Sequence, residues 1–180
     1  MPSFRWVSEE EVFRGYLFSV AEVVLADPDG RTFERSVVHH PGAVTIVPVD
    51  EDRRVTLVRQ YRASVDDMVL ETPAGTRDVS GESLESTARR ELAEEAGLAA
   101  RAMVELMGTY NSPGYSDQRT TIFLATGLTP VPTNPVGVEE GFMTIETIAL
   151  HDLDALVADG TLVDATTIIG LYLARAHLDT

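Results

Sequence analysis

Alternating apolar and polar positions in the first third of the chain predict β-strands. Residues 15–25 and 32–40 are rich in β-branched and aromatic side chains, and the turn sequence Asp27-Pro28-Asp29-Gly30 lies between them. An Asp-Gly turn between two such runs is a strong β-hairpin signal. Residues 43–48 and 55–58 are β-branched runs separated by a charged turn, and they predict a second antiparallel pair.

Further along the chain, the apolar spacing changes to a helical period. Residues 83–96 are rich in Ala, Leu, Glu and Arg, and Gly97 follows as a left-handed C-cap. The other predicted segments are strands at 103–107, 120–126 and 142–150, a loop at 110–117, an irregular stretch at 128–138, and helices at 153–157 and 165–176. Strands and helices do not alternate regularly, so the predicted fold is α+β. It is a mixed β-sheet packed between helices, with an N-terminal antiparallel β-hairpin.

Composition narrows the class of protein. The 180 residues, 44% of them hydrophobic, suit one domain with a short accessory segment and a sizeable core. The 29 acidic and 14 basic residues give a formal net charge of -15. This charge repels nucleic-acid phosphates and anionic membranes, so neither is expected as a partner. A small phosphorylated substrate stays compatible with the charge if divalent cations bridge carboxylate to phosphate.

The chain contains no cysteine, which excludes disulfides, thiolate nucleophiles and cysteine-ligated metal sites. Acids occupy positions 9–11, where a signal peptide needs an apolar stretch, and no apolar run approaches membrane-spanning length. We therefore expect a cytoplasmic protein.

Three acids lie close together on the helix predicted over residues 83–96. Glu91, Glu94 and Glu95 fall within an arc of about 100°. Most such clusters are solvated faces, which lie opposite the apolar stripe. The stripe consists of Leu84, Ala88, Leu92 and Ala96. Glu95 lies about 40° and Glu91 about 80° from its centre, so we expect both carboxylates to border the core.

Carboxylates beside a core need compensating charge. Burial of an unpaired acid pair raises its pKa and destabilises the fold, so divalent cations or neighbouring arginines must compensate. Oxygen ligands in a chain without cysteine favour Mg²⁺ or Mn²⁺.

A specific motif spans residues 75–98. Seven residues separate Glu82 from Arg90, and the motif ends in Arg-Glu-Leu-Ala-Glu-Glu-Ala-Gly-Leu at residues 90–98. This motif resembles the signature of the Nudix hydrolase family, and its second half matches residue for residue. Six residues separate Gly75 from Glu82, one more than the family usually has. We expect a bulge there, with function retained.

The resemblance implies two or three divalent cations, Mg²⁺ or Mn²⁺, in each site. Their ligands would be Glu91, Glu95 and Glu94, completed by the backbone of Ala74 and by Glu82. Arg90 would orient these acids, so it belongs with Glu94 to the catalytic group. A plain surface ion pair between Arg90 and Glu94 is the alternative.

Residues outside the signature indicate a branch of the family. The segments FERSVVHHPGAV at 33–44, VRQYR at 58–62 and ETPAG at 71–75 resemble the ADP-ribose pyrophosphatase branch. That branch carries a proline about fifteen residues after the signature, where this chain has Pro113. The resemblance implies a homodimer that exchanges N-terminal strands. Residues 1–40 would form the dimerising segment and residues 41–180 the catalytic domain.

The same resemblance suggests substrate contacts. Arg62, and with less support Arg35, would bind diphosphate or ribose-phosphate oxygens, since guanidinium pairs bidentately with phosphate. Either arginine is alternatively an ordinary surface residue. Pro113 and Tyr115 would line the pocket. Ser36 stands where relatives often carry an acid for the adenine edge, so base recognition stays open among the aromatic residues Trp6, Tyr16, Phe18 and Tyr115.

The resemblance also implies that the group that takes the proton of the attacking water lies in a loop late in the chain. Glu140, followed by Glu139, is the candidate in the loop at 137–141, although two exposed loop acids are the alternative. The predicted function is Mg²⁺-dependent hydrolysis of the diphosphate bond of ADP-ribose to AMP and ribose 5-phosphate. Hydrolysis of another sugar nucleotide such as GDP-mannose, or a non-catalytic sensing module for nucleotide sugars, is the alternative. The histidines show no ligand spacing and are assigned no chemistry.

Overall fold

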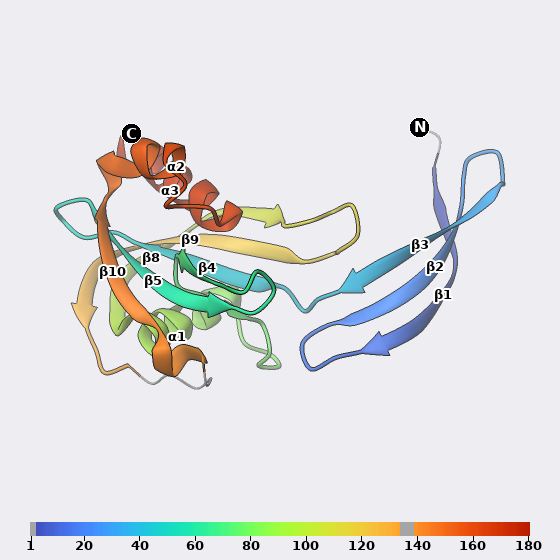
Figure 1. Cartoon of the computed structure of the whole chain (residues 1–180), viewed down its shortest axis with the longest axis horizontal. Helices are drawn as coiled ribbons and strands as arrows, with labels where there is room; N and C mark the ends of the chain where they lie inside the picture. Colours follow the sequence, from blue (N-terminus) through green and yellow to red (C-terminus); the bar gives the residue numbers. More distant parts are fainter. Residues whose placement is uncertain (1–2, 134–138) are drawn as a thin grey trace. The chain divides into compact units, whose positions relative to one another are not determined.

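The computed structural model describes residues 3–133 and 139–180 (Figure 1). By its contacts the chain forms two compact units. The first contains the residues up to Gly42 together with Tyr110–Arg119, and the second contains Ala43–Thr109 and Thr120–Thr180. The predicted division between residues 40 and 41 thus lies near the first boundary, but the loop that carries Pro113 belongs to the N-terminal unit.

The first unit is a three-stranded antiparallel sheet in the order β1-β2-β3. Its strands are β1 (Arg5–Arg14), β2 (Ser19–Ala26) and β3 (Thr32–His39). The β2–β3 hairpin is the predicted one, and Asp27 stabilises its turn by accepting the backbone N–H groups of Asp29 at 2.9 Å and Arg31 at 2.8 Å. Strand β1 was not predicted. All ten of its positions are exposed, so it carries no alternating burial pattern.

The loop Tyr110–Arg119 is attached to the third strand of this sheet. The N–H of Val38 donates to the carbonyl of Tyr115 at 2.8 Å, and the N–H of Asp117 donates to the carbonyl of Val38 at 3.1 Å. Ser116 forms a parallel bridge with Val38. Backbone hydrogen bonds therefore hold this loop in a defined conformation on β3.

The second unit contains two sheets, with strand orders β7-β4-β9-β8 and β10-β5-β6. Their strands are β4 (Ala43–Pro48), β5 (Arg54–Arg62), β6 (Asp67–Glu71), β7 (Ala74–Thr76), β8 (Leu98–Tyr110), β9 (Arg119–Pro130) and β10 (Thr144–Ala149). The predicted pairing of β4 with β5 is wrong. Strand β4 pairs with β7 and, in parallel, with β9. The turn after β4 meets the start of β5 at the bridge Val49–Val55 and in a hydrogen bond from the N–H of Asp50 to the carbonyl of Arg54 at 3.0 Å.

Helices cover both faces of the β7-β4-β9-β8 sheet (Figure 1). The helical segments are α1 (Leu84–Ala96), η1 (Glu139–Phe142), η2 (Leu150–Asp152), α2 (Leu153–Ala158) and α3 (Ala165–Leu178). Along β4, Val44 and Ile46 pack in one core cluster with Leu92 of α1, whereas Val47 packs in the other cluster with Leu171 of α3. This alternation gives an α/β/α sandwich, which confirms the predicted fold class.

The sequence predicted the type of most helices and strands, but it did not predict most of their lengths. Strands β8 and β9 are longer than predicted, β6 and β7 were not predicted, and residues 128–130 of the stretch predicted to be irregular continue β9. Residues 134–138 of that stretch lie outside the described residues. No helix within the described ranges is long and apolar enough to cross a membrane.

Candidate active site

Capping at both ends fixes the position of helix α1. At its N-terminus the hydroxyl of Ser83 accepts the N–H of Ser86 at 3.1 Å. At its C-terminus Gly97 adopts φ 63°, a left-handed conformation, and its N–H bonds to the carbonyl of Ala93 at 3.1 Å. The helix predicted over residues 83–96 is therefore confirmed, and Glu82 lies directly before its first turn.

The three acids of α1 differ in burial as the helix geometry predicted. Glu95 is only 6% exposed, while the Glu91 and Glu94 side chains are 12% and 23% exposed. Burial raises the pKa of Glu91 from 4.5 to about 7, and the adjacent guanidinium of Arg90 only partly opposes this rise. Glu91 and Glu95 thus border the core as predicted.

Arg90 joins the acidic side chains into one network. Its Nη1 donates to Glu91 at 2.7 Å and to Glu94 at 3.0 Å, and its Nη2 donates to Glu82 at 3.3 Å. This hydrogen bond from Arg90 lowers the pKa of Glu82, and the hydroxyl of Thr87 also donates to Glu82 at 2.9 Å. Arg90 therefore contacts three of the predicted ligands at once, which is more than a single surface pair with Glu94.

Strand β7 brings backbone groups to the same acids. The N–H of Ala74 donates to Oε2 of Glu95 at 2.9 Å, whereas the carbonyl of Pro73 accepts the N–H of Ile46 in β4 at 2.8 Å. In an extended strand the N–H and C=O of one residue project to the same side, so the carbonyl of Ala74 also points away from β4. It lies on the side of Glu95, as a backbone ligand requires.

Gly75 is the residue that lets Glu91 approach this strand. A Cβ atom at position 75 would lie 1.9 Å from the carboxyl carbon of Glu91. Only glycine leaves room for this contact, so its place in the motif has a steric reason. The additional residue before Glu82 is accommodated in a turn, where the N–H of Glu82 bonds to Val79 at 3.3 Å and Gly81 adopts φ 80°.

The donor chemistry of this cluster suits a hard divalent cation. Its polar atoms are carboxylate oxygens and the Ala74 carbonyl. The partly buried Glu91 lacks full charge compensation, because the guanidinium of Arg90 only partly opposes the rise of its pKa. Across residues 3–133 and 139–180, no three acidic or histidine side chains already converge in a geometry that would hold an ion. The acids are instead held by Arg90 and by the N–H of Ala74.

Arg62 lies on β5 and contacts an acid that the sequence analysis did not single out. Its Nε donates to the two oxygens of Glu71 at 2.9 Å and 3.2 Å, and Gln60 also donates to Glu71 at 3.3 Å. The bond to Glu71 raises the pKa of Arg62, and the charges of Glu95 and Asp164 add to this effect. Arg62 is therefore close enough to the acidic cluster for electrostatic interaction with Glu95. The one signal for Glu71 was its place at the start of the ETPAG segment.

The other predicted substrate contacts lie in the first unit. Arg35 on β3 donates to the carbonyl of Glu34 at 2.7 Å and lies over the ring of Phe33, 4.8 Å from its centroid. Pro113 is exposed and Tyr115 is 60% exposed in the attached loop. The structure thus groups Arg35, Pro113 and Tyr115 with the N-terminal sheet, and Arg62 with the acids of α1.

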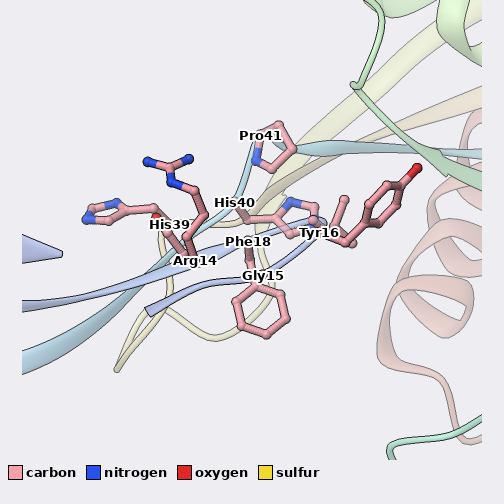
Figure 2. A pocket seen from close by; sticks show the side chains of 9 residues that line it. Arg14, Gly15, Tyr16, Phe18, His39, His40 and Pro41 are labelled. Carbon is pink, nitrogen blue, oxygen red and sulfur yellow. The ribbon is translucent and has the colours of Figure 1, made fainter. Parts of the chain in front are cut away.

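The first unit also contains a hollow of about 310 Å³. It is lined by the turn at residues 14–19 and by residues 39–41. Figure 2 shows Arg14, Phe18, His39 and His40 around it. Two residues considered for stacking on a base, Tyr16 and Phe18, belong to this lining.

Asp117 has a clear structural partner. Its carboxylate lies 2.6 Å from Nδ1 of His39 and accepts the N–H of His40 at 2.9 Å. Nε2 of His39 lies 3.2 Å from Glu9 of β1. The hydrogen bond to Asp117 raises the pKa of His39 above 6.5, although burial opposes the rise. His39 therefore links β1, β3 and the loop through charge.

The predicted water-handling acids begin the short helix η1. Glu139 and Glu140 are its first two residues, and η1 lies against β5. Their side chains are not among the described ones, and residues 137 and 138 of the predicted loop also lie outside the described part.

Comparison with known proteins agrees with the motif and the fold. Residues 39–168 match the NUDIX domain family, so the chain belongs to this family and is a Nudix hydrolase. The chain is 35% identical over 173 residues to the ADP-ribose pyrophosphatase of Mycobacterium tuberculosis, covering 96% of this chain and 84% of the relative. It is 31% identical over 161 residues to the ADP-ribose pyrophosphatase of Bacillus subtilis, covering 89% and 86%. A crystal structure of an ADP compounds hydrolase superposes with a TM-score of 0.85 at 27% identity, covering 99% of this chain and 94% of the other.

Proposed function

We propose that the chain hydrolyses the diphosphate bond of ADP-ribose to AMP and ribose 5-phosphate with Mg²⁺. The observation that carries the proposal is the position of the buried carboxylate of Glu95 and the partly buried carboxylate of Glu91 against the Ala74-Gly75 segment of β7. The similarity to two ADP-ribose pyrophosphatases supports the choice of substrate.

In this proposal the cations are held by carboxylate oxygens and one backbone carbonyl. Glu91, Glu95 and the carbonyl of Ala74 are the principal ligands, and Glu94 and Glu82 complete the set. Two or three Mg²⁺ ions, replaceable by Mn²⁺, suit this number of acids. When bound, such ions neutralise phosphate charge and acidify a bound water.

The side chains of the chain supply binding and orientation. Arg62 donates N–H groups to diphosphate oxygens, and Arg90 keeps Glu91 and Glu94 in place. Glu140, with Glu139 as the second candidate, orients the attacking water and receives its proton. The water oxygen forms the new bond to phosphorus, the P–O bond of the diphosphate bridge breaks, and the bridge oxygen leaves with one product.

We also propose that the N-terminal sheet makes the enzyme a homodimer. Strand β1 exposes Trp6 at 53% and Phe13 at 51%, which is the apolar surface that a second chain would cover. Arg35, Pro113 and Tyr115 would reach a substrate in such an assembly. Sedimentation equilibrium at micromolar concentration tests this proposal, and a purely monomeric species would contradict it. Cytoplasmic location stays a prediction.

A substrate panel tests the proposed reaction. Purified protein with Mg²⁺ is incubated with ADP-ribose, GDP-mannose and ATP, and the products are separated chromatographically. We expect turnover of ADP-ribose with AMP and ribose 5-phosphate in equal amounts. Preference for ATP or GDP-mannose, or products without AMP, would overturn the assignment.

Two variants of α1 separate an enzyme from a sensing module. Glu95→Gln removes a proposed ligand charge, and we expect it to lose most turnover. Glu85→Gln is the matched control, because the Glu85 side chain is 54% exposed and pairs only with Arg89 among the described ion pairs. Ligand binding without turnover in the unmodified protein would favour the sensing alternative.

A further inference from the structure

Glu71 is a buried acid at the end of β6. The residue is 7% exposed, although it carries a charge that water would otherwise solvate. Hydrogen bonds satisfy its carboxylate: Arg62 donates from Nε and Nη2, and Gln60 donates from Nε2. The carboxylate of Glu71 therefore binds one edge of the Arg62 guanidinium, the edge formed by Nε and Nη2.

The Arg62–Glu71 pair is asymmetric in exposure. The Glu71 side chain is 9% exposed, whereas the Arg62 side chain is 43% exposed. Guanidinium has five N–H donors in a plane, and the bonds to Glu71 use its Nε and Nη2. Within the described part of the chain, Nη1 makes no hydrogen bond. One edge of the guanidinium is thus fixed in the protein, and the other is available to an oxygen ligand.

The backbone beside Glu71 is held firmly. The neighbouring Thr72 is buried, its N–H donates to the hydroxyl of Thr167 at 2.9 Å, and its hydroxyl lies 2.7 Å from that of Thr45. These bonds connect the segment to α3 on one side and to β4 on the other. A satisfied buried network of this kind rigidifies its surroundings, so the backbone from which the Glu71 side chain extends is held in one position.

The same segment leads directly to the proposed metal ligands. Two residues after Thr72, Ala74 donates its N–H to Glu95 at 2.9 Å. The charge of Glu95 also acts on the Arg62 guanidinium. The Glu71–Ala74 segment therefore connects the support of Arg62 with the support of the acidic cluster.

We propose that Glu71 is a positioning residue that holds the guanidinium of Arg62 so that its free edge meets the diphosphate of the substrate. The proposal rests on the proposed function, because it takes Arg62 as a phosphate-binding group. Without Glu71 the long arginine side chain would sample other rotamers, and the bidentate geometry that phosphate favours would be lost.

A second arginine–glutamate pair in the same sheet provides a comparison. Arg59 of β5 donates to Glu146 of β10, and both side chains are partly exposed, at 31% and 38%. The Arg59–Glu146 pair has the same chemistry as Arg62–Glu71, but its acid is not buried and its two side chains are about equally exposed. Glu146→Gln is therefore the matched control for Glu71→Gln.

The test is a double-mutant cycle on Glu71→Gln and Arg62→Ala. KM and kcat for ADP-ribose are measured with Mg²⁺, and thermal unfolding is measured on the same samples. We expect Glu71→Gln to raise KM by about tenfold or more, the effect of losing one charge-assisted contact, and Glu146→Gln to change it less than about twofold.

The double variant separates positioning from folding. Arg62→Ala leaves the buried charge of Glu71 without its guanidinium and lowers the unfolding temperature. Adding Glu71→Gln removes that charge, so we expect the unfolding temperature to recover while KM stays at the value of Arg62→Ala. Equal KM in Glu71→Gln and the unmodified enzyme would overturn the proposal. A KM of the double variant that is raised by the product of the two single effects would also overturn it, because the two residues would then act independently.

If the unmodified protein does not hydrolyse ADP-ribose, the proposed function is overturned. The role of Glu71 is then tested by a binding measurement. Calorimetry with ADP as the probe then compares the unmodified protein with Glu71→Gln. A Kd weakened by about tenfold supports positioning of Arg62 toward a diphosphate. An unchanged Kd, or no binding to either protein, overturns it.

Discussion

The partly buried carboxylate of Glu91 leads to a stability prediction that can be measured without substrate. Its pKa is raised from 4.5 to about 7, chiefly by burial. The folded protein therefore holds this proton more tightly than the unfolded chain does. The stabilisation is complete below pH 4.5 and is lost as the pH rises to about 7, so the metal-free protein is destabilised above that pH.

The magnitude follows from the two pKa values. Each pH unit between 4.5 and about 7 corresponds to about 1.4 kcal/mol, which gives a cost of about 3 kcal/mol for the charged form. Glu91→Gln keeps the size of the side chain and an oxygen for Arg90 but removes the charge. In a chain of this length, about 3 kcal/mol corresponds to an increase of about 6–12 °C in unfolding temperature.

The assay is thermal unfolding in EDTA at pH 5.5 and pH 8.5 (about one to two units on either side of the raised pKa). We expect Glu91→Gln to be more stable than the unmodified protein at both pH values, by about 1.4 kcal/mol at the lower pH, which is about one unit above 4.5, and by about 3 kcal/mol at the upper pH. For the exposed Glu85→Gln control we expect a difference below about 1 kcal/mol at both pH values. A Glu91→Gln difference that does not grow with pH would refute the reasoning.

Magnesium extends the same experiment. A cation that binds Glu91 replaces the missing compensation, and it requires the deprotonated carboxylate. Mg²⁺ should therefore raise the unfolding temperature of the unmodified protein more at the upper pH than at the lower one. It should raise that of Glu91→Gln less. Equal effects of Mg²⁺ on both proteins would place the cation elsewhere.

Three further predictions concern other contacts of the structure. Gly75→Ala places a Cβ atom 1.9 Å from the carboxyl carbon of Glu91, so turnover of ADP-ribose should fall by at least about tenfold. Arg90→Gln removes the guanidinium that hydrogen-bonds to the acids. We expect the Mg²⁺ concentration needed for half-maximal activity to rise by about 10- to 100-fold, measured by Mg²⁺ titration. The pKa of His39 lies above 6.5 mainly through its hydrogen bond to Asp117, so the tie between loop and sheet is strongest below pH 6.5 and weakens as the pH rises through the raised value. Asp117→Asn should lower the pKa of His39 in an NMR titration, and an unchanged value would contradict this cause.

Helix α1 was predictable because all its determinants are local. Ser83 and Gly97 cap it, and the predicted range of 83–96 differs from the observed Leu84–Ala96 by one residue. The burial of Glu91 and Glu95 followed from helical angles alone. Residues four apart on one helix keep their relation in any fold, so the placement of these acids beside the core was predictable from sequence.

Strand pairing was less predictable because it depends on residues far apart in the chain. Adjacent runs suggested that β4 pairs with β5, but Ala43 of β4 pairs with Thr120 of β9. The buried pattern of β4 belongs to a central strand, which needs partners on both sides. Strand β1 has no buried position, so its pairing with β2 left no periodic signal.

Glu71 illustrates where sequence reasoning stops within the site. In the β5–β6 register Arg62 lies opposite Asp67, and Glu71 lies opposite Val58. A rule of direct cross-strand pairs would therefore have joined Arg62 to Asp67. The guanidinium instead extends along the sheet to Glu71, because that carboxylate is buried and without Arg62 would keep only the hydrogen bond from Gln60 among its described contacts. Burial selects the partner here, and burial arises from the packing of β6, β4 and α3 around the segment, which no local pattern encodes.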